Sequence, residues 1–225
     1  MLFDDWPERY EQWFTTPIGK LVKETETELI HQLLDIRSGE KLLDAGCGTG
    51  IFTLDFLREG ADVVGLDISR PMLNLAGTKL KDYSPSLVRG DMLCLPFKDN
   101  AFDKTISVTA LEFIEDATRA VNELFRVTRP GGWVIVATLN SLSPWAKRRK
   151  ARTRRHLLEN AFFRSPDEVL ACANLTGTVK TCVHFLNDDN PERAVQTERA
   201  GKIQGWDTGA FVAARWQKPN LSLRA

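Results

Sequence analysis

The sequence has no long apolar run and no surplus of either charge. Its 30 basic residues equal its 30 acidic residues, so the chain as a whole is not attracted to nucleic acid or to an anionic membrane. No apolar stretch approaches the roughly 20 residues that cross a bilayer, and residues 1–10 contain no apolar signal-peptide core. We therefore expect a soluble, cytoplasmic protein.

Paired cysteines are also missing, since none of the four belongs to a CxxC motif or to a spacing typical of zinc sites. We interpret them as reduced thiols and predict no metal site. The 225 residues, 43% of them apolar and 27% charged, suffice for one α/β domain with a real core and do not suit a disordered chain. We therefore expect a single domain over residues 1–225.

Strand and helix patterns alternate along residues 20–139, which predicts parallel βαβ units. The expected strands are 41–45, 62–67, 86–89, 102–108 and 133–139, and the expected helices are 20–36, 51–59, 70–80 and 116–128. Beyond residue 140 the pattern changes. We expect helices at 143–160, which is strongly basic, and at 166–174, strands at 178–185 and 209–216, and a polar stretch at 187–205.

A glycine-rich turn, GCGTG at residues 46–50, joins the first strand to a helix. Glycine is needed where the backbone has a positive φ or closely approaches a ligand. A dinucleotide fingerprint is GxGxxG, whereas this turn reads GxGxG and has Ile51 where the last glycine would stand. The spacing favours a nucleoside without phosphates, and Asp44 at the end of the strand could take up part of the ligand's charge or orient the turn.

Two further acids follow the turn at informative positions. Asp67 ends the second strand about 20 residues after the first glycine, where an acid meets ribose hydroxyls. Asp91 and Met92 follow the third strand, where they could contact an adenine. Taken singly, the turn could be structural, Asp67 could be a helix cap and Asp91 could have no role. Their order within one βαβαβ half favours an adenosine site.

At these residues the chain resembles the class I S-adenosylmethionine-dependent methyltransferases, specifically the UbiE-like, type 11 branch of small-molecule enzymes. The similarity runs from about Tyr10 to Leu139 and rests on the motifs LLDAGCGTG, VVGLDIS, GDMLCLPF, AFDKTISVTALEFIED and RVTRPGGWVIVATLN. It implies a Rossmann-like α/β fold with a seven-stranded, mostly parallel sheet whose last strand is antiparallel. Helices would cover both faces, and a helical lid would follow the fifth strand.

The resemblance also divides the chain and assigns a cofactor site. The implied segments are N-terminal cap helices at 1–36, a cofactor-binding core at 40–140, a basic lid at 141–165 and a C-terminal helix with strands at 166–217. The implied cofactor is S-adenosyl-L-methionine, with S-adenosyl-L-homocysteine as its product. The residues expected to contact it are Tyr10, Asp44, Gly46, Cys47, Gly48, Asp67, Ile68, Asp91, Met92, Thr109 and Leu111.

The chain departs from its relatives after the fourth strand. Many of them have a histidine there, where this chain has Glu112 and Phe113, and the Asn/Asp-Pro-Pro-aromatic motif of amino-methylating nucleic-acid enzymes is missing. Methyl transfer needs an in-line nucleophile, a dry pocket and, for some acceptors, a base, and positioning alone supplies much of the rate. The candidate catalytic bases are Glu112 and His156. We expect His31 and His184 to be packing or surface residues.

The basic segment 147–156 is the most unusual feature of the composition. It could recognise an anionic substrate, an anionic membrane surface or RNA, or it could be a solvated helix face. RNA is the weakest of these because Trp145 is the one aromatic residue nearby. The candidate substrate-binding residues are Arg148, Arg149, Arg152 and Trp13. Trp13 belongs to an aromatic cluster with Trp6, Tyr10 and Phe14, which we expect to be packing or the lining of a pocket for an apolar acceptor.

We therefore predict methyl transfer from S-adenosylmethionine to an anionic or apolar small molecule, mainly by positioning and in-line attack. The alternatives are a methyltransferase-fold binding subunit without activity, an RNA methyltransferase and a nicotinamide-dependent oxidoreductase. The GxGxG spacing argues against the last of these. The sequence leaves the acceptor, the methylated atom and the oligomeric state open.

Overall fold

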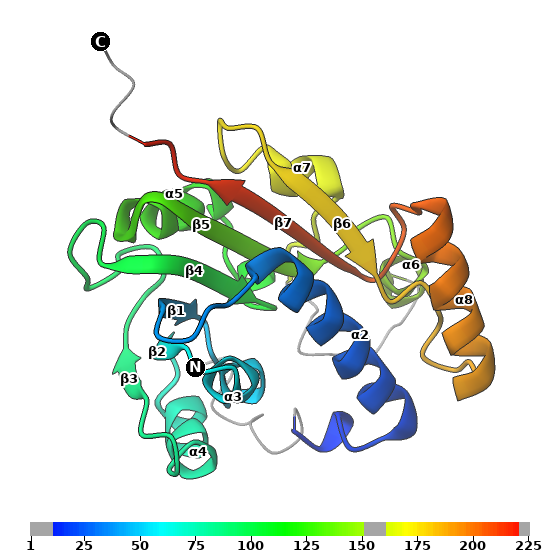
Figure 1. Cartoon of the computed structure of the whole chain (residues 1–225). Helices are drawn as coiled ribbons and strands as arrows, with labels where there is room; N and C mark the ends of the chain where they lie inside the picture. Colours follow the sequence, from blue (N-terminus) through cyan, green and yellow to red (C-terminus); the bar gives the residue numbers. More distant parts are fainter. Residues whose placement is uncertain (1–10, 151–160, 221–225) are drawn as a thin grey trace.

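Seven strands form one sheet in the order β3-β2-β1-β4-β5-β7-β6 in the computed structural model (Figure 1). The structure describes residues 11–150 and 161–220. The strands are β1 (Lys41–Ala45), β2 (Asp62–Asp67), β3 (Ser86–Arg89), β4 (Phe102–Val108), β5 (Thr128–Leu139), β6 (Thr178–Cys182) and β7 (Phe211–Gln217). The pairs among β1 to β5 are parallel, and β7 is antiparallel to both β5 and β6. The predicted Rossmann-like sheet is confirmed.

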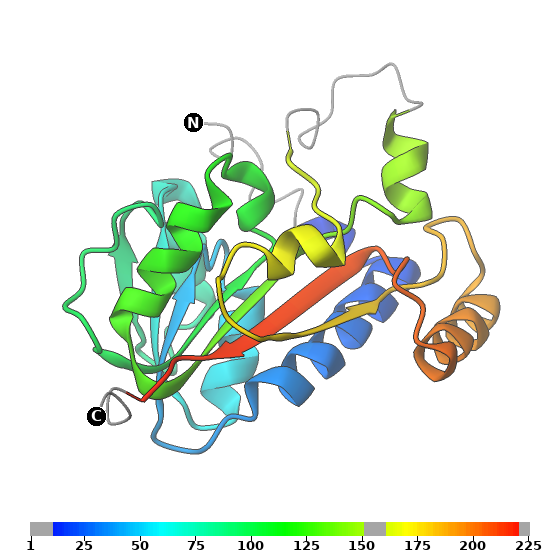
Figure 2. The same cartoon turned by 90° about the horizontal axis from the view of Figure 1, so that it is seen from above.

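Helices cover both faces of this sheet, as the view from above shows (Figure 2). The helices are α2 (Pro17–Leu34), α3 (Ile51–Arg58), α4 (Arg70–Lys79), the 3₁₀ turn η1 (Leu111–Phe113), α5 (Ala117–Val127), α6 (Pro144–Lys150), α7 (Pro166–Leu170) and α8 (Pro191–Gln204). Along β5, Ile135 and Ala137 belong to the core beneath α2 and α3, whereas Val134 and Val136 belong to the core beneath α5 and α7. Because both faces are buried here, the part of the strand from Trp133 to Leu139 is apolar almost throughout.

Most of the helices begin at a polar side chain that caps the first backbone amides. The caps of α2, α4, α5, α7 and α8 are Thr16, Ser69, Asp116, Ser165 and Asn190. Helix α3 differs because it begins at Gly50, which has a φ of 78° and offers no side-chain hydrogen bond. The first amides of α3, next to the glycine turn, therefore lack the side-chain acceptor that the other caps provide.

The largest difference from the sequence-based expectation is α8, which lies within the stretch interpreted only as polar. Its buried residues are Ala194, Glu198 and Gly201, so it shows none of the apolar periodicity that identifies helices. The signals that remain are local, namely the Asn190 cap, Pro191 in the first turn and Gly205 at the end.

Smaller differences concern the ends of elements. Strand β5 begins at Thr128 rather than at residue 133, with an irregular register opposite Phe102 and Lys104. Helix α7 and strand β6 are shorter than expected and end at Leu170 and Cys182. Of the basic helix expected at 143–160, the structure describes α6, and the remainder lies outside the described residues. The division of the chain into cap, core, lid and C-terminal segments stays a prediction.

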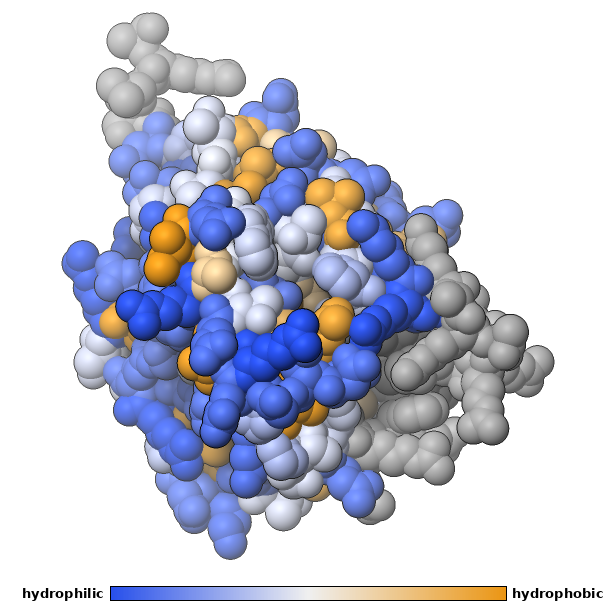
Figure 3. All heavy atoms as spheres, turned by 90° about the vertical axis from the view of Figure 1, so that its right-hand side faces the viewer, coloured by the Kyte–Doolittle hydropathy of each residue, from blue (hydrophilic) through white to orange (hydrophobic). Residues whose placement is uncertain are grey.

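The surface over α8 and the β6 edge is mainly hydrophilic, with small separate hydrophobic patches (Figure 3). Among the described helices, none is both long and apolar enough to cross a bilayer. The four cysteines are unpaired thiols.

Candidate functional site

The glycine turn after β1 is closely packed on one side and open on the other. A Cβ on Gly46, where φ is 80°, would lie 2.4 Å from the Cβ of Ala110 and 3.3 Å from Cε of Met92. A Cβ on Gly48, where φ is 53°, would meet no atom of the described residues within 4 Å. The end of β4 and the loop after β3 therefore support the turn, while its backbone at Gly48 is free for a ligand to approach.

Asp67 lies beside this turn and is held there by backbone amides. Its Oδ2 accepts the Gly48 N–H at 2.9 Å, and its Oδ1 accepts the Ser69 N–H at 2.8 Å. The turn is also fixed to the end of β2, because Gly46 and Cys47 both donate to the Leu66 carbonyl. Burial raises the pKa of Asp67, and these two amides oppose the rise. The acid and the turn, which the sequence linked by spacing alone, are in direct contact.

Asp44 and Cys47 form the buried base of the turn. The Thr53 hydroxyl donates to Oδ2 of Asp44 at 2.6 Å, and burial raises the pKa of Asp44 to about 7. The thiol of Cys47 packs against β2, since a Cβ on Gly65 would lie 3.0 Å from its Sγ. Burial also raises the pKa of this thiol. Cys47 therefore offers a ligand its backbone rather than its side chain.

The residues expected around the adenine differ in their exposure and in what they contact. Ile68 follows Asp67 and is 41% exposed, so its side chain is available to a ligand. Met92 is buried, and its Cε would lie 3.3 Å from a Cβ on Gly46. The Asp91 carboxylate is exposed and accepts the Leu93 N–H at 2.8 Å, which stabilises its own turn.

The two residues expected on the reactive side of the cofactor follow β4. Thr109 has a φ of 46°, unusual for a threonine, and its N–H donates to the Ala137 carbonyl at 2.8 Å. Leu111 is fully buried in the core beneath α5. The backbone turns sharply at Thr109, so the residues after it lie over the carboxyl ends of β4 and β5.

The N-terminal segment reaches the glycine turn through Glu11, which sequence reasoning missed. The Glu11 carboxylate accepts a hydrogen bond from the Thr49 hydroxyl and pairs with the Lys79 ammonium on α4. Trp13 packs against the core and makes an edge contact with Phe14, with ring centroids 4.8 Å apart. The predicted cofactor residue Tyr10 and the neighbouring Trp6 lie outside the described residues. No sequence pattern distinguished Glu11 from other acids.

Glu112, a predicted catalytic base, lies in the middle of η1 and is 1% exposed. The Thr138 hydroxyl donates to its Oε2 at 2.8 Å, and burial raises the pKa of Glu112 to about 7. Ala110, two residues earlier, contacts the position of Gly46, so Glu112 lies near the cofactor turn. His156, the other candidate, lies outside the described residues.

Glu26 is a second buried acid, and sequence reasoning missed it as well. It is 6% exposed on α2, on the face that packs against the sheet. Burial raises the pKa of Glu26 to about 8, Lys23 opposes that rise and the charge of Glu112 adds to it. A signal was present, because Val22, Glu26, Leu29 and Leu33 follow helical spacing and place an acid within an apolar stripe.

The two described arginines of the basic segment already have partners within the chain. Arg148 pairs with Asp188 at 2.6 Å, and Arg149 lies over the Phe163 ring, 4.2 Å from its centroid, and donates to the Ala161 carbonyl. Arg152 lies outside the described residues. These contacts attach α6 to neighbouring segments, and substrate binding by this segment stays a prediction.

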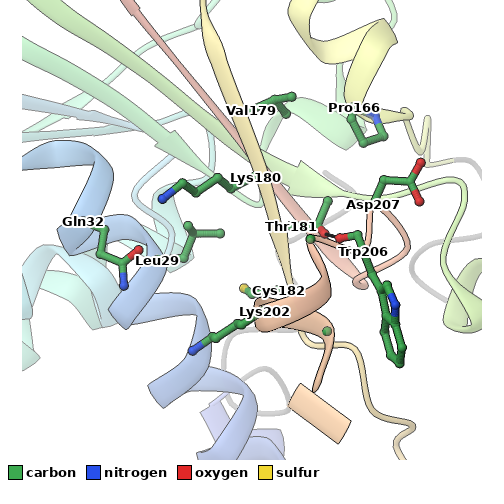
Figure 4. A pocket seen from close by; sticks show the side chains of 12 residues that line it. Leu29, Gln32, Pro166, Val179, Lys180, Thr181, Cys182, Lys202, Trp206 and Asp207 are labelled. Atoms are coloured by element: carbon green, nitrogen blue, oxygen red, sulfur yellow. Dashed lines mark hydrogen bonds between the residues drawn. The ribbon is translucent and has the colours of Figure 1, made fainter. Parts of the chain in front are cut away.

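A groove of about 420 Å³ runs between α2, β6 and α8 at the edge of the sheet (Figure 4). Figure 4 shows Lys180 and Thr181 from β6 on its wall, with Leu29 from α2 nearby. Strands β4, β5 and β7 separate β6 from β1, so this groove is distant from the glycine turn. Behind it, the His184 Nδ1 lies 3.0 Å from Oε2 of Glu198, which attaches α8 to the sheet.

Comparison with known proteins gives one family and a consistent set of relatives. The model of a family described as "Methyltransferase domain" matches residues 43–136. The chain is 37% identical over 153 residues to a demethylmenaquinone methyltransferase of Streptomyces avermitilis, covering 68% of this chain and 64% of that protein. It is 36% identical over 118 residues to a malonyl-[acyl-carrier protein] O-methyltransferase of Pectobacterium atrosepticum, covering 52% and 46%. The matched part thus spans about half to two thirds of the length of these relatives.

The fold also matches a solved structure over nearly its whole length. A Thermotoga maritima protein described as a SAM-dependent methyltransferase, possibly a histamine N-methyltransferase, has a TM-score of 0.73 and 24% sequence identity. The match covers 96% of this chain and 98% of that one. At this identity the likeness concerns the fold.

Proposed function

We propose that this chain, whose residues 43–136 match the methyltransferase-domain family, binds S-adenosylmethionine and transfers the methyl group to a small-molecule acceptor. The observation that carries the proposal is the contact between Asp67 and the glycine turn. The Asp67 carboxylate accepts the Gly48 amide at 2.9 Å, and no described atom lies within 4 Å of the position of a Cβ on Gly48. This arrangement suits an adenosine whose ribose hydroxyls need an acceptor.

The residues around the turn fit the remaining parts of that cofactor. The backbone of Gly46, Cys47 and Gly48 would hold the methionine end, and the buried carboxyl of Asp44 would lie beneath it. Asp67 would accept the ribose hydroxyls, and Ile68 and Met92 would flank the adenine. When bound, the cofactor supplies an electrophilic methyl group on a positively charged sulfur.

The task left to the chain is to place the acceptor in line, to exclude water and to hold a proton where the acceptor releases one. Placing two reactants in a fixed geometry removes much of the barrier. Glu112 is suited to the proton step because it is buried beyond the end of β4 and burial raises its pKa to about 7. A base with a pKa near the working pH is the most effective.

The names of the two curated relatives give a quinone precursor and a malonyl thioester as acceptors, both of them small groups rather than nucleic acid. We extend to this chain only their common property, a small-molecule acceptor. Among the described residues, Arg148 and Arg149 are engaged within the chain, so the RNA alternative receives no support from them.

Calorimetric titration of the purified protein with S-adenosylmethionine and, separately, with NADH tests the proposal. We expect binding of the first and none of the second. A screen of metabolite extracts with cofactor labelled in its methyl group would then identify the acceptor. Binding of NADH alone would refute the proposal. Cofactor binding without labelled product would favour the binding subunit, and label in RNA would favour the RNA enzyme.

A further inference from the structure

Three side chains from three separate segments meet beside the glycine turn. They are Glu11 before α2, Thr49 within the turn and Lys79 at the end of α4. The Lys79 ammonium pairs with the Glu11 carboxylate and lies 3.5 Å from Oγ1 of Thr49. The Thr49 hydroxyl donates to the same carboxylate. Each group therefore contacts the other two, and Glu11 joins the segment before α2 to the cofactor turn and to α4.

The turn and α4 are already held together without Glu11. A Cβ on Gly50 would lie 2.9 Å from Cδ1 of Leu80 and 3.4 Å from Cβ of Ala76. The end of α4 thus packs directly against the turn. The contacts of Glu11 are therefore not needed to build the predicted cofactor site, and what they add is the position of residues 11–16 relative to it.

Residues 11–16 are anchored to the rest of the chain at the end that leads into α2. Trp13 packs against the core, and its carbonyl accepts both the backbone N–H and the hydroxyl of Thr16, which caps α2. The contact at the other end is more open to solvent, because 32% of the Glu11 side chain and 21% of the Lys79 side chain are exposed. Ion pairs with such exposure contribute little stability, so this contact can open while the anchored end stays in place.

Glu11 lies next to the part of the turn that a ligand can approach. Thr49, whose hydroxyl Glu11 accepts, directly follows Gly48 and is 1% exposed. Gly48 is the residue at which no described atom would lie within 4 Å of a Cβ. A ligand that enters or leaves beside the Gly48 amide therefore passes close to Glu11.

We propose that Glu11, Thr49 and Lys79 form a latch that holds residues 11–16 against the glycine turn and controls the exchange of the cofactor. None of the three groups needs an atom of the cofactor for its contacts, so the latch can close whether or not the cofactor is bound. When closed it slows both entry and release. The proposal rests on the proposed function because the ligand that it controls is the cofactor of that reaction.

A latch has a kinetic signature that an ordinary supporting contact lacks. If the latch closes equally well with and without the cofactor, weakening it raises the association and dissociation rates by the same factor. The dissociation constant then stays nearly the same, because the cofactor does not favour either position of the latch. A contact that exists only in the complex would instead change the dissociation rate alone.

Stopped-flow tryptophan fluorescence on the full chain measures both rates for S-adenosylhomocysteine. We expect association and dissociation to be about threefold to tenfold faster in E11Q than in the wild type, from the loss of a charged partner. The dissociation constant should change by less than about twofold. Raising the salt concentration from about 0.05 M to about 1 M should speed both rates in the wild type and have little effect on E11Q.

Charge reversal assigns the effect to the pair. E11K and K79E each place like charges together and should exchange the ligand at least as fast as E11Q, whereas the double variant E11K/K79E should return close to the wild-type rates. The matched control is D55N, because Asp55 pairs with Lys23 at a similar exposure of 22% and 19%. That pair joins α2 to α3, so D55N should exchange the ligand like the wild type. Melting temperatures check the fold of each variant, and the salt comparison on the wild type needs no variant.

The latch would be overturned by E11Q rates equal to those of the wild type, or by faster release with unchanged association. A double reversal that exchanges as fast as the single ones would also overturn it. In these cases S-adenosylhomocysteine still binds, and the proposed function stands. A wild-type protein that binds neither S-adenosylmethionine nor S-adenosylhomocysteine would refute the proposed function and the latch with it, so the two failures can be distinguished.

Discussion

The buried carboxyl of Glu26 should make the stability of the unliganded protein depend on pH, and E26Q should remove that dependence. Glutamine has nearly the shape of a protonated glutamate and cannot ionise. The charged and titratable groups that act on Glu26 or respond to it are Lys23 and Glu112, and the thiol of Cys182, whose pKa Glu26 helps to raise. These groups are present in both proteins, so the difference between wild type and variant isolates Glu26.

The magnitude follows from burial. The pKa of Glu26 rises from 4.5 to about 8 in the folded chain. At about 1.4 kcal/mol for each pKa unit, ionising it in place costs about 5 kcal/mol at most. Below pH 4.5 the carboxyl of Glu26 is protonated in both the folded and the unfolded chain, and the stability of the folded state is at its full value. As the pH rises, the unfolded chain ionises first, so stability is lost on the way to and through about pH 8. The wild type should therefore lose stability relative to E26Q between pH 5 and pH 9.

Urea unfolding at pH 5, 7 and 9, without ligand, measures the effect. The free energies of unfolding of wild type and E26Q should be similar at pH 5, and the variant should be the more stable by a few kcal/mol at pH 9. E24Q, on the exposed side of α2, should follow the wild type at each pH. If the difference between wild type and E26Q is constant from pH 5 to pH 9, Glu26 ionises freely in the folded chain and the reasoning is wrong.

Three further predictions concern the glycine turn. Replacing Asp67 by alanine should weaken S-adenosylmethionine binding by about 1–3 kcal/mol, because ribose hydroxyls lose their acceptor; an unchanged affinity by calorimetry would remove the assignment. G46A should lower the melting temperature more than G39A. Both positions have positive φ, but a Cβ at Gly46 would lie 2.4 Å from another carbon, whereas at Gly39 no atom of the described chain would lie within 4 Å; equal losses in thermal unfolding would contradict this. E11Q removes the ion pair with Lys79 and should speed cofactor release in stopped-flow experiments, with little effect on the melting temperature.

The elements of the cofactor half could be predicted almost to the residue. Strands β1, β2, β3 and β4 have the predicted bounds, because a short apolar run between polar or glycine breaks reports local conformation directly. Helix α8 could not be predicted from periodicity, since it buries few residues and is polar on nearly all sides. Its docking depends on contacts such as His184 with Glu198, which join separate parts of the chain.

In the candidate site, too, some residues could be predicted from the sequence and others could not. The glycine turn and Asp67 were predicted together because their spacing is set by one βα unit, and the structure adds that the two are hydrogen-bonded. Glu11 and Glu26 were missed, because only the surroundings of an acid in the folded chain distinguish it from the other acids of the sequence. In both cases the surroundings come from segments far away along the chain.

By itself the sequence determined the succession of strands and helices in the cofactor half, the glycine turn and the acid that accompanies it, because these depend on neighbours within one βα unit. Only the tertiary structure decided that Glu26 on α2 and Glu112 on η1 are buried. The physical reason is that burial and charge depend on distance in space. Acids that are unremarkable in the sequence acquire a raised pKa only when packing removes their water.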